Sequence, residues 1–134
     1  MENPSGRRRV VVTGMGAITP LGVGVDRFWA AAVSGASGIR RMTLADPSNY
    51  PCQVAGEVPD FDPLQWVDRK EARRMDRFVH LAIAAAGEAL DQSKLDVAAE
   101  AEEIGCMIGA GIGGMGTLGK ERLEMPSESA GLVS

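Results

Sequence analysis

The sequence predicts an α/β protein, and three features of the chain indicate this class. Three consecutive valines, residues 10–12, precede a glycine turn and predict a short strand buried on both faces. A second apolar run, residues 104–110, also ends in glycines and predicts a second buried strand. Between them, apolar side chains at helical spacing over residues 68–92 predict one long amphipathic helix. Together with a shorter helix before it and another at the end, this order favours a sheet that is at least partly parallel.

The region between the first strand and the long helix is predicted to hold one helix and a long irregular segment. The helix is expected from Asp26, which can cap its N-terminus, to Gly35, which can end it. Residues 37–67 are rich in Pro, Gly, Ser and Asp, which predicts a loop with extended pieces around 52–58. A turn is expected at residues 62–63.

The C-terminal part of the chain is predicted to run from an acidic connector, residues 96–103, through the second strand to a last helix over 115–124. Two strands do not complete a twisted α/β sheet, which normally has several more. Both predicted strands are therefore expected to expose pairing edges unless further residues supply their neighbours.

Composition limits the class of protein before any motif is considered. A chain of 134 residues is long enough for one domain, and 45% hydrophobic with 24% charged residues excludes a disordered, collagen-like or coiled-coil chain. The net charge of −4 argues against general nucleic-acid binding, which depends on basic side chains. No apolar run reaches the roughly 18 to 20 residues that cross a bilayer, and the start lacks the apolar centre of a secretory signal. Two cysteines are too few for a disulfide framework, so a soluble, cytoplasmic protein is expected.

The glycine turn after the valines first raises the possibility of a dinucleotide site. Gly14 and Gly16 directly follow a predicted strand, as in turns that cradle pyrophosphate at a helix N-terminus. The third glycine of such a turn would fall at Thr19, and Pro20 biases Thr19 away from the helical region. No second strand ending in an acid follows about 20 residues later. Dinucleotide binding is therefore the weakest of the hypotheses considered.

Four segments, in this order along the chain, resemble the elongating 3-oxoacyl-[acyl-carrier-protein] synthases of the condensing-enzyme family. They are RRVVVTGMGAITPLG, AAVSGASGIRRM, VDRKEARRMDRFVHLAIAAAGEALDQSKLD and IGCMIGAGIGGMGTL. The resemblance is clear over about residues 7–123 and is only loose over 124–134. It implies that residues 1–134 are an N-terminal, incomplete portion of a β-ketoacyl synthase domain. The implied fold is the thiolase-like layered α/β/α/β/α fold.

The resemblance also implies an activity, and it locates the catalytic residues outside this chain. In the family, a cysteine in a Thr-Ala-Cys setting is acylated, and two histidines assist decarboxylation of a malonyl thioester. No residue of this sequence matches these positions. The implied parent is a homodimeric acyltransferase that elongates fatty acids by condensing malonyl-acyl-carrier-protein with an acyl-enzyme thioester, without a cofactor. The chain alone is expected to be inactive, and a second hypothesis makes it a non-catalytic module that binds acyl carrier protein.

Four basic residues on the predicted long helix form a candidate docking face. Lys70, Arg73, Arg74 and Arg77 fall within one arc opposite the apolar stripe if the helix is continuous. A solvated helix face is the simpler interpretation. The resemblance implies instead that Lys70, Arg73 and Arg74 help to dock the acidic acyl carrier protein through long-range attraction.

The glycine loop after the second predicted strand, residues 109–114, is the candidate substrate site. Glycines after a strand commonly only make a turn. The resemblance implies that Ile112, together with Gly111, lines the acyl-chain pocket and sets the accepted chain length.

The remaining reactive side chains predict no catalytic or metal site. Cys106 is expected to be a small core residue, since it lies in a predicted buried strand with no basic neighbour, and Cys52 is likewise expected to be structural. His80 falls at the boundary between the apolar and polar faces of the long helix. With a single histidine, neither a Cys-His-His arrangement nor a histidine metal cluster can be built from this chain.

Overall fold

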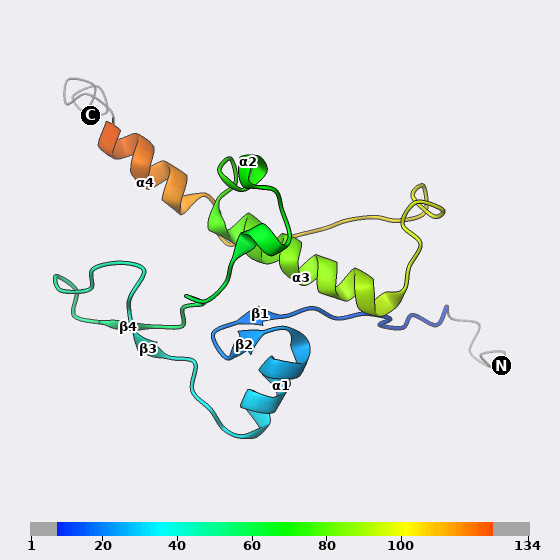
Figure 1. Cartoon of the computed structure of the whole chain (residues 1–134), viewed down its shortest axis with the longest axis horizontal. Coiled ribbons are helices and arrows are strands. Elements are labelled where there is room, and N and C mark those ends of the chain that lie inside the picture. Colours follow the sequence, from blue (N-terminus) through cyan, green and yellow to red (C-terminus); the bar gives the residue numbers. More distant parts are fainter. Residues whose placement is uncertain (1–7, 125–134) are drawn as a thin grey trace. The chain divides into compact units, whose positions relative to one another are not determined.

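The computed structural model describes residues 8–124, which fold into short strands and helices grouped in two compact units (Figure 1). The elements are β1 (Ile18–Thr19), β2 (Gly22–Val23), α1 (Val25–Val33), β3 (Arg40–Arg41), β4 (Val54–Ala55), η1 (Pro63–Gln65), α2 (Arg69–Ala72), α3 (Arg77–Ser93) and α4 (Met115–Glu124). Of the described residues, the first unit contains 8–61 and 84–104. The second contains 62–83 and 105–124.

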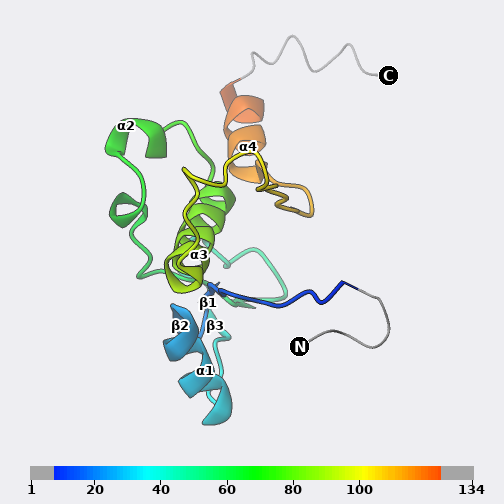
Figure 2. The ribbon, with the colours of Figure 1, turned by 90° about the vertical axis from the view of Figure 1, so that its right-hand side faces the viewer.

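A tight hairpin followed by a helix begins the first unit. Strands β1 and β2 pair antiparallel, with Ile18 opposite Val23. The Thr19 hydroxyl donates to the Gly22 carbonyl at 3.2 Å and also accepts from the Leu21 N–H at 3.2 Å, which closes the turn. Helix α1 follows directly and packs on the hairpin (Figure 2).

The ends of α1 are both set by glycine. Gly24 is the N-cap residue, with φ of 96°, and Asp26 lies one position inside the first turn. The prediction that Asp26 caps this helix is therefore wrong. At the other end Gly35 has φ of 71°, a left-handed conformation that glycine adopts without steric cost. The predicted helix stop at Gly35 is confirmed.

The irregular region of the first unit is held by a second short hairpin and one carboxylate. Strands β3 and β4 pair antiparallel, with Arg40 opposite Ala55. Glu57 accepts from the Thr43 N–H and hydroxyl, both at 2.8 Å, and from the Leu44 N–H at 3.0 Å. A loop with extended pieces was predicted here and is confirmed.

The second unit begins with two short helices capped by aspartates. The Asp62 side chain accepts from the Leu64 N–H at 3.0 Å and starts η1, which accounts for the predicted turn at 62–63. The Asp68 side chain accepts from the N–H groups of Lys70 at 2.8 Å and Glu71 at 2.9 Å and starts α2.

The long helix predicted over residues 68–92 is broken into α2 and α3. Helix α2 ends at Ala72, and α3 begins at Arg77 after a turn in which the Met75 N–H donates to the Ala72 carbonyl at 3.4 Å. Asp76 begins the new helix, since its carbonyl accepts from the Val79 N–H at 3.0 Å. Apolar spacing continues through the break, so periodicity alone predicted one helix.

Neither predicted buried strand forms among the described residues. Val10 is 91% exposed and Met107 is 97% exposed, and the segments 10–12 and 104–110 have no ladder partner in the part of the chain that the structure describes. A strand forms only where a neighbouring backbone provides hydrogen-bond partners, whereas an apolar run in the sequence indicates only that the segment favours burial. Both two-stranded sheets are antiparallel, so the predicted parallel pairing is also wrong for residues 8–124.

The described part of the chain combines helices with small sheets around few buried side chains. Phe61, at 6% exposure, and Ala84, at 0%, form the buried apolar centre of the first unit. Helix α4 forms over the predicted residues 115–124. Over residues 8–124, none of the helices combines the length and the apolar character required to cross a bilayer.

Candidate functional site

The two glycines of the first turn lie directly against the backbone of α3. A methyl group on Gly14 would overlap the Ala89 carbonyl oxygen, and one on Gly16 would overlap the Ala85 carbonyl oxygen. The chain then enters the β1–β2 hairpin instead of a helix. Both glycines thus serve close backbone packing, and the helix N-terminus that a dinucleotide site requires is not formed there.

Two polar side chains of α3 hold the segment that follows these glycines. The Glu88 carboxylate accepts from the Ala17 N–H at 2.9 Å and from the Val25 N–H at 2.7 Å. The Gln92 side-chain oxygen accepts from the Met15 N–H at 2.6 Å. Glu88 and Gln92 lie one helical turn apart on the same face. Sequence reasoning missed this role, and its only signal is a pair of polar residues beside an apolar stripe.

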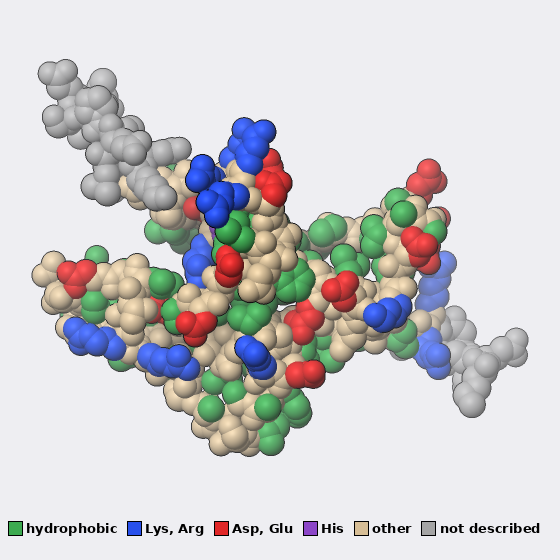
Figure 3. All heavy atoms as spheres, viewed as in Figure 1, with side chains coloured by type: hydrophobic (Ala, Val, Ile, Leu, Met, Phe, Trp, Pro, Cys, Tyr) green, Lys and Arg blue, Asp and Glu red, His purple; other side chains and the backbone are tan. Residues whose placement is uncertain are grey.

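The basic residues predicted for docking are exposed, but they do not share one helix. Lys70 lies in α2, Arg73 is its C-cap residue, and Arg74 lies in the turn after it. The single arc that a continuous helix would make, which also included Arg77, is therefore wrong. Figure 3 shows Lys and Arg side chains gathered around α2. We call residues 70–74 the basic segment.

One ion pair lies within the basic segment. Arg74 Nη1 is 3.6 Å from Glu71 Oε1, and the Arg74 side chain is 66% exposed. Within residues 8–124, the side chains of Lys70 and Arg73 have no ion-pair partner. Exposed pairs of this kind contribute about 0–1 kcal/mol, so this one does not restrain the segment strongly.

Ile112 lines a hollow within the second unit. The residue is 79% exposed, and the open hollow has a volume of about 520 Å³. Met75, Phe78, Val79 and Leu118 form its apolar part, and Asp76 and Thr117 add polar atoms. Gly111 is exposed and does not line this hollow. The structure therefore brings Ile112, but not Gly111, to a cavity.

Asp76 connects the start of α3 with the glycine loop and α4. The Thr117 hydroxyl donates to Asp76 Oδ2 at 2.9 Å. A methyl group on Gly116 would lie 3.2 Å from Asp76 Oδ1, and one on Gly114 would lie 3.3 Å from Asp76 Oδ2. A methyl group on Gly113 would likewise lie 3.0 Å from Phe78 Cζ. The contact between Asp76 and Thr117 was not predicted from the sequence, because the two residues lie 41 positions apart.

The two cysteines are exposed free thiols. The prediction that Cys106 is a core residue is therefore wrong, and the structural role expected of Cys52 stays a prediction. His80 is half-buried, with Nε2 2.9 Å from the Ala72 carbonyl oxygen, which confirms its predicted boundary position. The part of the chain that the structure describes contains no group of His, Cys, Asp or Glu side chains suited to a metal ion.

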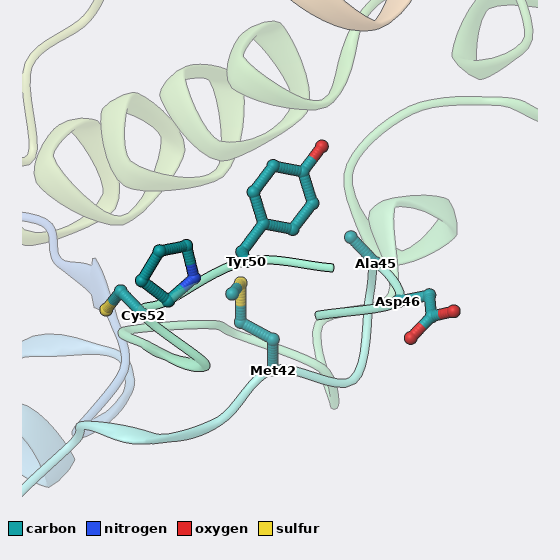
Figure 4. Close-up of a pocket in the computed structure, with 6 residues that line it drawn as sticks. Met42, Ala45, Asp46, Tyr50 and Cys52 are labelled. Carbon is teal, nitrogen blue, oxygen red and sulfur yellow. The ribbon is translucent and has the colours of Figure 1, made fainter. Parts of the chain in front are cut away.

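A further hollow lies in the loop between β3 and β4 of the first unit, with a volume of about 580 Å³ (Figure 4). Its lining is mostly apolar and includes Met42, Tyr50 and Cys52. Asp46 lies at its side. The hydrogen bonds from the Ser48 hydroxyl at 2.6 Å and the Ser48 N–H at 3.0 Å lower the pKa of Asp46. A single exposed carboxylate beside apolar side chains does not provide the pair of nucleophile and general base that a catalytic site would need.

The second unit thus contains both the exposed basic segment and the glycine loop, whose Ile112 lines a hollow. The chain belongs to the β-ketoacyl synthase family: residues 7–132 match the family model described as "Beta-ketoacyl synthase, N-terminal domain". The family resemblance of the four segments is thereby confirmed.

Curated relatives and a solved structure agree with this assignment. The chain is similar to 3-oxoacyl-[acyl-carrier-protein] synthase 2 of Synechocystis sp., at 48% identity over 84% of this chain and 27% of the relative. It is 46% identical to the protein of the same name from Staphylococcus aureus strain COL, over 84% of this chain and 28% of that one. The solved structure titled "The ishigamide ketosynthase/chain length factor" matches with a TM-score of 0.64 and 39% identity, over 69% of this chain and 23% of that chain.

The solved relative confirms the fold class, an α/β chain corresponding to the N-terminal part of the thiolase-like ketosynthase fold. The chain spans only about a quarter of the length of the curated relatives it matches. The residues predicted for the substrate and carrier sites all lie in the second unit: Lys70, Arg73, Arg74, Gly111 and Ile112.

Proposed function

We propose that this chain forms the N-terminal part of a 3-oxoacyl-[acyl-carrier-protein] synthase. The proposed enzyme elongates fatty acids by condensing malonyl-acyl-carrier-protein with an acyl-enzyme thioester. The malonyl group releases carbon dioxide in this step. The observation that carries the proposal is the family match over residues 7–132, together with 48% identity to a synthase of this name. Acyl and malonyl thioesters are its proposed substrates, and a cytoplasmic homodimer is its proposed form.

Catalysis requires residues outside the described chain. A condensing site needs a thiolate nucleophile and groups that stabilise the oxyanion of the enolate. The only histidine, His80, contacts the Ala72 carbonyl and not a thiol. The role proposed for this chain is therefore to provide the carrier-docking surface and one wall of the acyl pocket.

The isolated 134-residue chain is expected to show no condensing activity, whereas a chimaera should be active. In the chimaera, this chain replaces the matching 113 residues of the Synechocystis enzyme. The measurement is formation of 3-oxoacyl-carrier-protein from acyl- and malonyl-carrier-protein, compared with the intact Synechocystis enzyme. A correctly folded chimaera that forms no product would contradict the proposed function.

A second candidate function, a non-catalytic module that binds acyl carrier protein, rests on the exposed basic segment alone. This hypothesis expects the isolated chain to melt cooperatively and to bind carrier protein without any partner domain. The few buried side chains of residues 8–124 favour the first proposal.

We further propose that the basic segment docks acyl carrier protein. Lys70, Arg73 and Arg74 are exposed within five consecutive residues, and neighbouring exposed cations raise the encounter rate with an acidic partner. Helix α2 is too short to align them on one face, so the segment presents them at a helix end and the turn after it.

Charge reversal of Lys70→Glu with Arg73→Glu is expected to weaken carrier binding by the chimaera about tenfold or more at low salt, since electrostatic steering changes association rates by roughly 10 to 1,000-fold. The difference should shrink as salt screens the charges. Binding is measured by surface plasmon resonance at two ionic strengths. Arg8→Glu with Arg9→Glu is the matched control, because it changes the net charge equally at exposed residues of the first unit. Equal affinities for both double variants would contradict the docking proposal.

Ile112 is proposed to line the acyl-chain pocket, and the adjacent Gly111, which does not line the hollow, is proposed to belong to the loop that carries Ile112. The support is that Ile112 projects from a glycine loop into an apolar hollow with Phe78 and Leu118. In an apolar pocket, one methylene changes discrimination by roughly 10 to 200-fold, so a smaller side chain at Ile112 should admit longer acyl chains.

A further inference from the structure

Asp76 occupies the junction between three elements of the second unit. It ends the break between α2 and α3, and its backbone carbonyl begins the hydrogen bonding of α3. Its carboxylate accepts from the Thr117 hydroxyl in the first turn of α4 at 2.9 Å. One residue thus ties the end of the glycine loop to the start of α3.

The backbone between Ile112 and Thr117 is restrained by close contacts at this junction. Gly113 and Gly114 have φ of 63° and 59°, which glycine adopts readily and other residues adopt rarely. Gly113 passes against the Phe78 ring, and Gly114 and Gly116 pass close to the Asp76 carboxylate. The Leu118 N–H donates to the Gly114 carbonyl at 3.0 Å, so α4 starts at a fixed point of the loop.

The position of Ile112 follows from these contacts. Ile112 directly precedes Gly113 and is 79% exposed as a residue, so its own packing does not hold it in place. Its place in the hollow depends on the backbone after it, which the Asp76–Thr117 hydrogen bond and the Phe78 contact hold. A shift of about 1 Å in a substrate-positioning group can cost roughly a hundredfold in rate.

We propose that Asp76 is a positioning residue that acts through Thr117 to place Ile112, and thereby sets the acyl chain length that the enzyme accepts. This inference rests on the proposed function. Asp76 does not touch the acyl chain in this role. It differs from a simple structural residue because its loss should change the ratio of rates for long and short substrates, and not only stability.

The test uses the Synechocystis chimaera and measures kcat/KM for a long and a short acyl-carrier-protein. Thr117→Val removes the hydroxyl and keeps the shape, while Thr117→Ser keeps the hydroxyl. Thr117→Val and Asp76→Ala each remove the hydrogen bond between these two side chains, and each is expected to change the long-to-short ratio roughly fivefold or more, a factor of the size that one lost hydrogen bond produces. Thr117→Ser should restore the ratio to within about twofold of the starting protein.

A double-mutant cycle shows whether Asp76 acts through Ile112. In an Ile112→Ala background, Thr117→Val should leave the long-to-short ratio unchanged, because the side chain that the Asp76–Thr117 hydrogen bond positions is no longer present. If Thr117→Val and Asp76→Ala, with Ile112 present, elongated acyl chains at an unchanged long-to-short ratio, the inference would be overturned. A shift of equal size with and without Ile112 would overturn it as well. Loss of elongation in the starting chimaera would instead overturn the proposed function, and the inference with it.

Discussion

Replacing Gly16 by alanine is expected to destabilise the packing of the first turn on α3 by about 3 kcal/mol, the upper part of the range for overpacking. The added methyl would overlap the Ala85 carbonyl oxygen. This oxygen belongs to a helix backbone and cannot rotate aside as a side chain can. The helix and the turn must therefore separate, which also lengthens the hydrogen bonds of Glu88 to the chain after the turn.

Hydrogen exchange of the chimaera measures this effect locally, because exchange reports the free energy of opening of each segment. Peptides covering residues 14–25 and 84–93 should lose protection together. Gly35→Ala is the matched control: a methyl there has open space within 4 Å, but φ is +71°. Strain at this φ should cost about 1 kcal/mol at the end of α1 alone. Equal protection losses from the two substitutions would show that Gly16 is not required for the close approach.

Elements with local signals were predicted well from the sequence. Gly35 ends α1 because a left-handed residue is favourable at a helix end, and this preference belongs to the residue itself. Helix α4 over 115–124 also matched its prediction. The valine run 10–12 failed as a strand, since burial of a strand depends on neighbours that these residues cannot supply themselves.

The candidate site was predicted only in part, for a related reason. Ile112 was placed by resemblance, and the structure adds the hollow that it lines. The break after Ala72 was missed, because the apolar spacing continues across it while the hydrogen bonds do not. Asp76 and Glu88 were missed because each binds groups more than 40 residues away in the sequence, and a single sequence carries no signal for such pairs.

Replacing Glu88 by alanine is expected to cost about 2–3 kcal/mol, because two backbone N–H groups lose a charged acceptor at a half-buried site. One of these, the Val25 N–H, belongs to the first turn of α1, where backbone N–H groups have no acceptor within the helix and the N-cap residue Gly24 brings no polar side chain. Glu88 supplies the missing acceptor from α3, and its negative charge also suits the positive end of the α1 dipole.

Glu88→Gln distinguishes the contribution of the hydrogen bonds from that of side-chain packing, because glutamine has the same size as glutamate. Its amide has one acceptor oxygen and presents donors on the other side, so only one of the two N–H groups keeps a partner. Hydrogen exchange of the chimaera should therefore show one of the amides of Ala17 and Val25 losing protection in Glu88→Gln, and both in Glu88→Ala. Full protection of both amides in Glu88→Gln would mean that side-chain volume, and not the carboxylate, holds the hairpin and α1 on α3.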